Sequence, residues 1–325
     1  MSHTRASQKA GLFQCHYQGG TQSWTWSSEY GALRNEQSKL CLCENWILCD
    51  CEKNEWNNDL IPHVLFRLSY VPKMDRDPMS KYDFNERVSA ALGPHRSSYP
   101  DLRHSTCKSG SKNLRDNRKL LSTTVIICFV DEEFNTLLRT IYSVLTRSPS
   151  DLLDEIILVD DGSTDLRLLN ELPLYIDRHL PRTRLVRTHA RTGLIRARVR
   201  GVSEASSPTV TFLDSHVEVS EGWLTPLMER LSDMTLPRLI VCPVITVINQ
   251  NTLKPQASLD HGNTAYGVFD WKMIFHWKYH RKDPAPFIRG HKAISPSDPL
   301  ESPTMAGGLF SMRVKDFYEL GTYHL

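Results

Sequence analysis

Carboxylates and one imidazole follow three short apolar runs of this sequence. Glu132 follows the first run, Asp160 and Asp161 follow the second, and Asp214 and His216 follow the third. In an open α/β sheet, ligands bind beyond the carboxyl ends of the strands, because the loops converge there. If the runs are strands of one such sheet, the pattern predicts a ligand site with metal-competent groups at that edge.

Asp214 and His216 form the sharpest of these pairs. In an extended segment residues i and i+2 point the same way, so a carboxylate oxygen and an imidazole nitrogen can reach one cation together. Oxygen with imidazole suits a divalent ion such as Mn²⁺, which would bridge a diphosphate and neutralise the charge that develops as it leaves. The alternative is that Asp214 caps a following helix while His216 is merely solvated.

Two further groups would suit a nucleotide. Asp161 would accept a hydrogen bond from a base or a ribose, as acidic residues do in other nucleotide folds, although an Asp-Asp-Gly-Ser segment can also be a simple turn. Arg191 stands just ahead of a predicted helix start, where guanidinium and helix N-terminus both favour phosphate or nucleobase oxygens. On the same helix, Arg198 and Arg200 are predicted to form a solvated basic face.

These groups need a scaffold, and strand-like and helical patterns alternate from residue 122 onward. Residues 123–129 are continuously apolar and β-branched, which is typical of a strand buried on both faces. Apolar residues then recur at helical spacing from 134 to 145. The further predicted elements are strands at 155–159, 184–187, 209–213 and 239–248 and helices at 166–180, 194–205 and 222–231. Such units predict a Rossmann-like, mostly parallel sheet with helices on both faces.

The chain before this domain has a different character. Residues 1–80 show no sustained period, and residues 81–121 are mainly polar, so we expect a divergent N-terminal segment and an arm that packs on a domain spanning 122–325. Five of the eight cysteines lie in the first 51 residues, at Cys15, Cys41, Cys43, Cys49 and Cys51. Their spacing gives little support to a metal site, and free or locally paired thiols are the simpler interpretation.

Composition excludes some partners. The 325 residues contain 39 Lys and Arg against 37 Asp and Glu, and a net charge of +2 gives no electrostatic case for nucleic acid or an anionic membrane. We see no run of about 20 apolar residues that would span a bilayer, and no signal peptide at the N-terminus. Any anionic ligand must therefore be bound by local chemistry.

Several segments share their residues and their order with one enzyme family. They are PDLRH at 100–104, EIILVDD at 155–161, GLIRAR at 193–198, FLDSH at 212–216, EGWL at 221–224 and PTMAGGLF at 303–310. Together they resemble the polypeptide N-acetylgalactosaminyltransferases, which begin mucin-type O-glycosylation in the Golgi. The resemblance covers about residues 82–323, and so many ordered matches argue against chance.

The resemblance implies a glycosyltransferase A fold, the donor UDP-N-acetylgalactosamine, Mn²⁺, and transfer of the sugar to Ser or Thr of a protein in the Golgi. By position it implies a uridine pocket of Cys128, Phe129, Asp161 and Arg191, a metal motif of Asp214 and His216, a sugar pocket of Ala306, Gly307 and Gly308, and acceptor contacts at Phe275 and Trp277. By the same resemblance, Asp214 would bind the nucleotide sugar as well as the metal. For both aromatics core packing is the alternative, and for the glycines an ordinary turn. No catalytic residue is assigned.

The sequence also departs from the family. Val130 stands where the family has a histidine, and Val268 where it has a glycine. After Leu325 the family continues into a Trp-Gly-Gly-Glu-Asn segment, a third metal-ligating histidine and a lectin domain, so we expect a catalytic domain that is incomplete at its C-terminus. Cys107 resembles a family cysteine whose disulfide partner would lie beyond that end. Two alternatives stay open: an inactive truncated isoform that acts as a binding protein, and a UDP-sugar glycosyltransferase of other specificity.

Overall fold

The structure is a computed structural model of the chain. It describes residues 12–17, 20–27, 32–34, 40–41, 77, 79, 81–96, 98–103, 107–108, 119–256, 265–279 and 299–323. The chain divides into two compact units, Met1–Pro72 and Lys73–Leu325. The predicted boundaries at 80 and 121 are not tested by this division and stay predictions.

The first unit contains a four-stranded antiparallel sheet. Its strands pair in chain order and are β1 (Leu12–Tyr17), β2 (Gly20–Ser27), β3 (Ala32–Arg34) and β4 (Leu40–Cys41). β3 and β4 have only three and two residues, too few for an alternating pattern to predict them. The side chains of Cys15 and of the Cys41 to Cys51 cluster lie outside the described residues, so their roles stay predictions.

The second unit is built on a six-stranded sheet in the order β7-β6-β5-β8-β14-β9. The strands are β5 (Thr123–Phe129), β6 (Leu153–Asp160), β7 (Thr183–Arg187), β8 (Thr209–Leu213), β9 (Ile240–Val241) and β14 (Phe310–Arg313). β5 to β8 run parallel, whereas β14 is antiparallel to both β8 and β9. The predicted glycosyltransferase A type of α/β fold, with a mostly parallel sheet, is confirmed.

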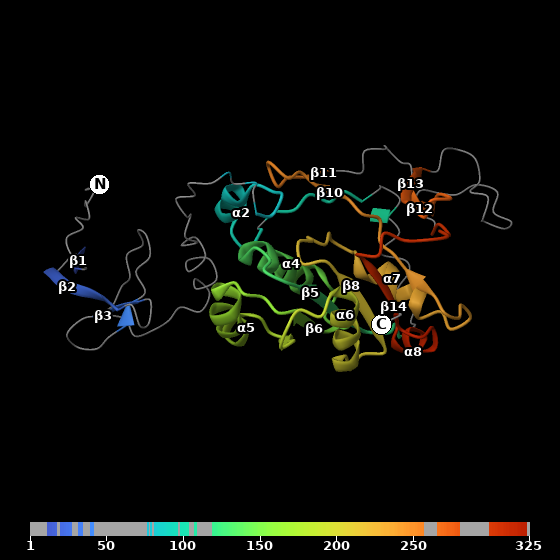
Figure 1. Ribbon diagram of the computed structural model, residues 1–325, viewed down its shortest axis with the longest axis horizontal. Coiled ribbons are helices and arrows are strands. Elements are labelled where there is room, and N and C mark those ends of the chain that lie inside the picture. Colours follow the sequence, from blue (N-terminus) through green and yellow to red (C-terminus); the bar gives the residue numbers. More distant parts are fainter. Residues whose placement is uncertain are drawn as a thin grey trace. The chain divides into compact units, whose positions relative to one another are not determined.

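Helices cover both faces of this sheet. They are α4 (Phe134–Arg147), α5 (Leu172–His179), α6 (Leu194–Glu204), α7 (Leu224–Leu231) and α8 (Val314–Glu319). Val125 and Ile126 on β5 point to opposite faces and neither is exposed. Ile126 packs in a cluster with Ala197 of α6 and Phe317 of α8, and α4 lies on the opposite side of the sheet from α6 (Figure 1). The carboxyl ends of β5, β6 and β8 thus share one edge.

Three predicted elements differ from the structure. The apolar run 239–248 is not one strand but contains β9 and, separately, β10 (Val247–Ile248), which pairs with β11 (Pro255–Gln256). Its side chains are largely exposed, so the run lacks the two-sided burial that a central strand needs. The helix predicted at 166–180 is a π-helical turn, η1 (Arg167–Glu171), followed by α5 with a proline in its first turn. The helix predicted from residue 222 begins two residues later, at α7.

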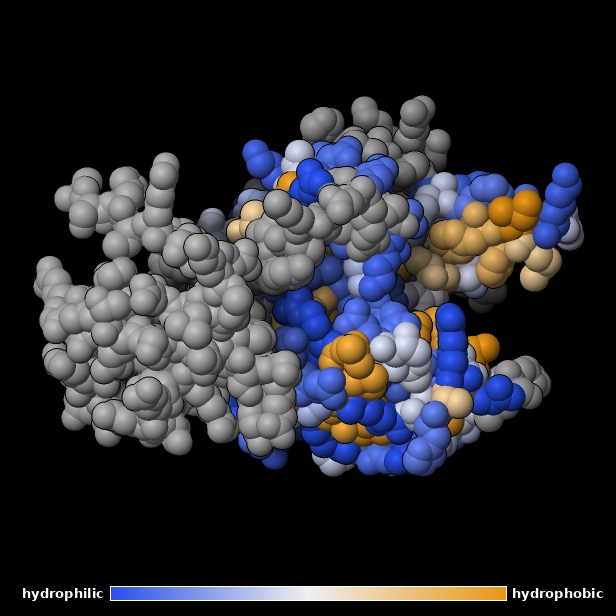
Figure 2. All heavy atoms as spheres, turned by 60° about the vertical axis from the view of Figure 1, so that its left-hand side comes forward, coloured by the Kyte–Doolittle hydropathy of each residue, from blue (hydrophilic) through white to orange (hydrophobic). Residues whose placement is uncertain are grey.

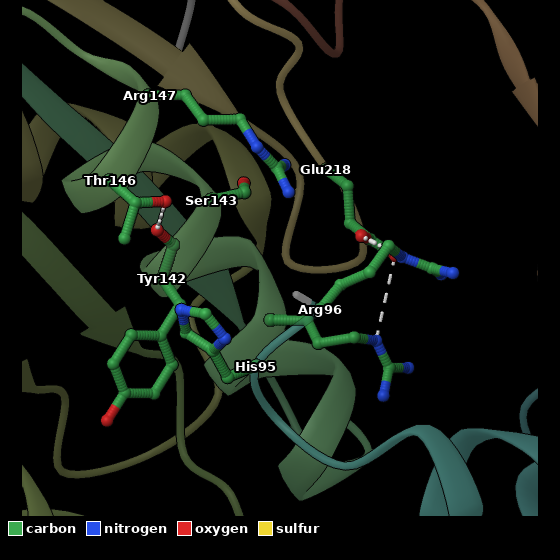
Figure 3. Close-up of a pocket in the computed structure, with 8 residues that line it drawn as sticks. His95, Arg96, Tyr142, Ser143, Thr146, Arg147 and Glu218 are labelled. Atoms are coloured by element: carbon green, nitrogen blue, oxygen red, sulfur yellow. Dashed lines mark hydrogen bonds and ion pairs between the residues drawn. The ribbon is translucent and has the colours of Figure 1, made fainter. Parts of the chain in front are cut away.

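The polar segment before β5 contacts α4 through a buried ionic network. It contains α2 (Glu86–Leu92), and Arg139 of α4 donates to the Ser89 carbonyl at 3.1 Å and to the Gly93 carbonyl at 2.7 Å. Arg96 binds Glu218 in a bidentate ion pair, with donor–acceptor distances of 2.6 and 2.8 Å. These two side chains line a small cavity together with His95 and Arg147 (Figure 3). Buried, doubly hydrogen-bonded pairs of this kind fix the position of a segment.

A second hairpin presents apolar side chains to solvent. β12 (Ala265–Phe269) pairs with β13 (Phe275–Tyr279) as a separate two-stranded sheet, and Trp271 and Met273 in its turn are exposed. Patches of apolar surface interrupt the hydrophilic surface of the described part (Figure 2). Among the described residues, no helix combines the length and the hydropathy needed to cross a bilayer.

Candidate functional site

At the exit of β6, the loop that leads into α6 occupies both oxygens of the Asp161 carboxylate. Oδ1 accepts hydrogen bonds from the Thr188 hydroxyl at 3.1 Å and from the Thr192 amide and hydroxyl at 2.9 and 2.7 Å. Oδ2 accepts from the Gly193 amide at 2.7 Å. Asp161 is only 5% exposed. It therefore holds the N-terminus of α6 against the strand exit, whatever else it contacts.

The same hydrogen bonds set the charge of Asp161. Burial raises the pKa of its carboxyl group, but the bonds from Thr192, Gly193 and Thr188 outweigh burial and lower the pKa overall. Beside it, burial raises the pKa of the Cys128 thiol to about 12, so this thiol is protonated at neutral pH. Phe129 is 4% exposed and belongs mainly to the core. The residues predicted for a uridine pocket thus include an ionised carboxylate and a protonated thiol, and the pocket itself stays a prediction.

Arg191 is brought next to this carboxylate by a close backbone approach. Gly162 has φ +81°, and a Cβ at this position would lie 2.6 Å from the Arg191 backbone nitrogen. Only glycine meets both demands without strain. The Arg191 side chain is exposed and has no ion-pair partner in the part of the chain that the structure describes. Its guanidinium is therefore accessible to a ligand, and its role as a nucleotide contact stays a prediction.

The exit of β8 holds a different kind of carboxylate. The Asp214 side chain is 40% exposed, and its Oδ1 lies 3.8 Å from the Arg198 guanidinium. A Cβ on Gly308 would lie 2.4 Å from Asp214 Oδ2. The structure thus brings together two predicted site residues that are 94 positions apart, and glycine at 308 leaves the Asp214 carboxylate in this position, because a Cβ there would displace it.

His216 reaches its position by a turn and not by an extended strand. β8 ends at Leu213, and Ser215 and His216 form a turn, so the period-two argument from the sequence is wrong for this pair. His216 Nδ1 lies 3.0 Å from Glu132 Oε2, which also accepts from the Ser215 hydroxyl at 2.6 Å. The bond to Glu132, aided by the nearby charge of Asp214, raises the pKa of His216. The helix-cap alternative for Asp214 does not apply, since the next helix after it, α7, begins ten residues later at Leu224.

Asp214 and His216 fit a divalent cation in kind but supply only two ligands. With Nδ1 directed at Glu132, the other ring nitrogen, Nε2, is left for a metal, an arrangement common in metal sites. Carboxylate oxygen and imidazole nitrogen suit Mn²⁺. Within the described ranges, no group of three His, Cys, Asp or Glu side chains is close enough to hold an ion. Water and phosphate oxygens would have to complete the coordination.

Of the predicted sugar segment, residues 306–308, one residue lies against the Asp214 carboxylate. Gly308 contacts Asp214, whereas Gly307 has φ +82° with open space where a Cβ would be, and Ala306 is exposed. The ordinary-turn interpretation accounts for Gly307 but not for Gly308. Ala306 and Gly307 form an open surface next to the contact.

The predicted acceptor residues lie on β13. Phe275 stacks edge-on against Trp277 at 5.1 Å and against Phe269 at 6.1 Å between ring centres. A Cβ on Gly267 would lie 2.6 Å from the Phe275 ring, so this ring packs on the hairpin itself. Trp277 is 44% exposed, which excludes the core-packing alternative for its ring. The backbone of Gly267 bridges to Thr304, which connects the hairpin to the 306–308 segment.

A cavity of about 390 Å³ opens beside His216. The residues around it come from the polar segment, the N-terminus of α4, the loop after β8 and the β10–β11 hairpin, and they include Tyr82, Phe84, Glu132, Val217, Ile248 and Gln250. Its wall is part apolar and part hydrogen-bonding, which is usual for small-molecule sites. No sequence pattern predicted it, because its walls come from four separate segments.

Two residues of the site were missed by the sequence interpretation. Arg198 was predicted on a solvated face, but it is 7% exposed and paired with Asp214, whereas Arg200 is exposed as predicted. Helical spacing could have predicted the burial of Arg198, since this residue lies on the buried stripe of α6 with Ala197 and Gly201. Glu132 was noted only as an acidic group after a strand, and nothing in the sequence pairs it with His216.

Comparison with known proteins adds independent findings. The sequence model of "Glycosyl transferase family 2" matches residues 124–321. Polypeptide N-acetylgalactosaminyltransferase 4 of Mus musculus is 43% identical over 252 residues, covering 77% of this chain and 41% of the relative. Polypeptide N-acetylgalactosaminyltransferase 13 of Homo sapiens is 38% identical over 266 residues, covering 81% and 45%.

A solved structure is similar as well. The crystal structure of GalNAc-T7 with UDP, GalNAc and Mn²⁺ has a TM-score of 0.62 and 32% identity, and the match covers 74% of this chain and 42% of that one. The chain therefore spans about two fifths of the length of the relatives that it matches.

Proposed function

The chain belongs to glycosyl transferase family 2 and, within it, to the polypeptide N-acetylgalactosaminyltransferases, and from this premise we propose that it binds UDP-N-acetylgalactosamine and transfers the sugar to Ser or Thr of a protein. The observation that carries the proposal is the contact between Asp214 and Gly308 at the same edge of the sheet as Asp161, since β6 and β8 both run parallel to β5. An ionised group at one strand exit and a partly exposed one at another would flank a nucleotide diphosphate.

Each site residue has a task in this mechanism. Asp161 holds the loop that carries Arg191, whose guanidinium would bind uridine or phosphate oxygens. Asp214 and His216 would hold Mn²⁺, which when bound supplies positive charge to the departing diphosphate. Gly308 keeps the space beside Asp214 free of side-chain atoms, so that the sugar ring can approach. Glu132 orients His216 through its Nδ1 nitrogen.

The acceptor and the compartment are the least direct parts of the proposal. The exposed ring of Trp277, with Phe275 behind it, would supply an aromatic surface for an acceptor peptide. The backbone link between Gly267 and Thr304 supports this placement, because it joins the aromatic hairpin to the proposed sugar segment. We propose residence in the Golgi from kinship with enzymes that begin O-glycosylation.

One observation favours a second candidate, a protein that binds the nucleotide sugar without transferring it. Within the described residues no group of three His, Cys, Asp or Glu side chains could hold a cation, so Asp214 and His216 would be its only protein ligands of these types there. A cation with most of its coordination left to water and phosphate is held weakly. A third candidate, transfer of another UDP-linked sugar, differs only in the contacts that the sugar makes near Gly308.

Calorimetric titrations test the proposal. We expect UDP and UDP-N-acetylgalactosamine to bind with Mn²⁺ present and to bind at least tenfold more weakly without it, because the cation carries much of the diphosphate contact. GDP-mannose serves as the control nucleotide sugar, and a panel of UDP-sugars ranks donor specificity. Binding that ignores Mn²⁺, or no binding, would contradict the proposal. Binding without transfer to a Ser/Thr peptide would favour the second candidate.

A further inference from the structure

Arg198 is a buried cation that the proposed function does not yet use. Its guanidinium carbon lies 5.4 Å from the centre of the Phe212 ring and 5.6 Å from that of Phe310, and the residue is 7% exposed. Contact with two aromatic faces offsets part of the cost of burial, but a guanidinium in such a place still needs polar partners.

The polar partners of Arg198 come from three separate segments. Its Nη2 lies 3.8 Å from Asp214 Oδ1 and 3.4 Å from the carbonyl oxygen of Gly308, and its Nη1 donates to the Tyr323 hydroxyl at 3.4 Å. These contacts are long for hydrogen bonds, so none of them alone is strong. Arg198 thus contacts both Asp214, the proposed metal ligand, and Gly308, in the proposed sugar segment.

The pairing with Asp214 also changes what a diphosphate would meet. A lone carboxylate at the exit of β8 would repel an incoming polyanion. The guanidinium of Arg198, which lies beside the Phe212 and Phe310 rings and 3.8 Å from Asp214 Oδ1, opposes part of that charge before any ligand arrives.

We propose that Arg198 is a positioning residue of the donor site, which holds the Asp214 carboxylate and the Gly308 carbonyl in a fixed relation and offsets the charge of Asp214 toward a sugar diphosphate. This inference rests on the proposed function, because it takes Asp214 and Gly308 as parts of the donor site. Arg198 itself is not taken to contact the reacting atoms.

The test compares two arginines of α6. Arg198→Met keeps an apolar stem of similar length beside the Phe212 and Phe310 rings, which pack on each other at 4.6 Å between centres, and Arg198→Lys keeps the charge but loses the planar fork. Arg200→Met is the matched control, since Arg200 is exposed and pairs with Glu204 at 2.5 Å on the same helix. We expect calorimetry with UDP-N-acetylgalactosamine and Mn²⁺ to show binding weakened about tenfold or more in Arg198→Met, less in Arg198→Lys, and within twofold of wild type in Arg200→Met.

Amide hydrogen exchange of the ligand-free protein gives a second readout. If Arg198 positions the site, exchange in Arg198→Met rises mainly in residues 306–309 and 214–216. If it only packs beside the Phe212 and Phe310 rings, exchange rises in β8 and β14 instead, and this result overturns the inference. Unchanged donor binding in a folded Arg198→Met protein also overturns it. If the wild-type protein binds no UDP-sugar, the proposed function fails, and the exchange pattern decides the role of Arg198 by itself.

Discussion

The exits of β6 and β8 present two carboxylates with opposite surroundings. Asp161 is 5% exposed and accepts four hydrogen bonds from the loop before α6. The Asp214 side chain is 40% exposed, and its one ion-pair partner among the described residues is Arg198, at 3.8 Å. The first carboxylate is part of the scaffold that shapes the pocket, whereas the second keeps unsatisfied oxygen lone pairs for a ligand.

The comparison separates two roles for a carboxylate at a strand exit: holding the loop that follows and binding a ligand. Position at a strand exit does not by itself make a carboxylate a ligand, because a following loop can use all of its acceptor capacity. The residue that remains underused, partly exposed and faced by glycine is the better candidate for chemistry.

The largest effect is expected from replacing the saturated carboxylate. In Asp161→Asn an amide NH₂ would face donors of Thr192 or Gly193, which leaves buried polar groups unsatisfied. We expect the free energy of unfolding in urea to fall by about 2–3 kcal/mol. Asp214→Asn, at the partly exposed site, should cost less than about 1 kcal/mol. Equal losses in the two variants would remove the distinction between scaffold and ligand carboxylate.

The next effect comes from filling the space in front of Asp214. A methyl group in Gly308→Ala would lie 2.4 Å from Asp214 Oδ2, so the carboxylate has to move. We expect a stability loss of about 1–3 kcal/mol in thermal unfolding and clearly weaker binding of UDP-N-acetylgalactosamine. Gly321→Ala is the control for donor binding, because its left-handed backbone (φ +85°) makes alanine destabilising there too, while the added methyl group would have nothing within 4 Å and lies outside the site. Wild-type donor affinity in Gly308→Ala would contradict the close contact.

A smaller effect is expected at the residue behind His216. Glu132→Gln keeps the shape but weakens the acceptor that faces His216 Nδ1 at 3.0 Å. Loss of such a partner typically lowers metal affinity about 10-fold to 100-fold, and we expect the low end because the set has only two protein ligands. Calorimetry with Mn²⁺ and UDP measures it, with the exposed Glu171→Gln as the control. No change would mean that Glu132 does not orient the imidazole.

The smallest effect is a pH dependence of stability. Burial raises the pKa of Asp161, but its hydrogen bonds outweigh burial, so the folded pKa lies below the unfolded one. The folded state then binds fewer protons, and the stability that Asp161 contributes at neutral pH is lost as pH falls through its folded pKa, below about 4. Urea unfolding from pH 7 to pH 3 should show a shallower acid loss in Asp161→Asn than in wild type. Parallel curves would refute this.

The sequence predicted the scaffold well, because each buried strand is a contiguous apolar run. Residues 209–213 are an uninterrupted example, and the predicted strand coincides with β8. The run 239–248 shows the limit of that signal: it is as apolar as β5, yet a run of hydrophobic residues does not reveal whether neighbours exist on both faces.

The site was predicted in its components but not in its contacts. The sequence singled out Asp161, Asp214 and Gly308, but the pairing of Asp214 with Gly308 depends on β14 entering the sheet beside β8. Arg198 was assigned to solvent because arginine is usually exposed, although its helical position marks it as buried. His216 was placed by a strand periodicity that ends at Leu213. A local sequence pattern does not predict which distant strands pair or where a strand ends in a turn.

Electron paramagnetic resonance of Mn²⁺ tests the central claim most directly, namely that the underused carboxylate of Asp214 acts with His216 at a metal and diphosphate site. We expect the signal of free Mn²⁺ to fall when the wild-type chain and UDP are both added. We expect Asp214→Asn and His216→Ala each to restore the signal, while Asp161→Asn restores it only as far as the protein unfolds. An Asp214→Asn, His216→Ala double variant that binds Mn²⁺ and UDP as tightly as wild type would contradict the account.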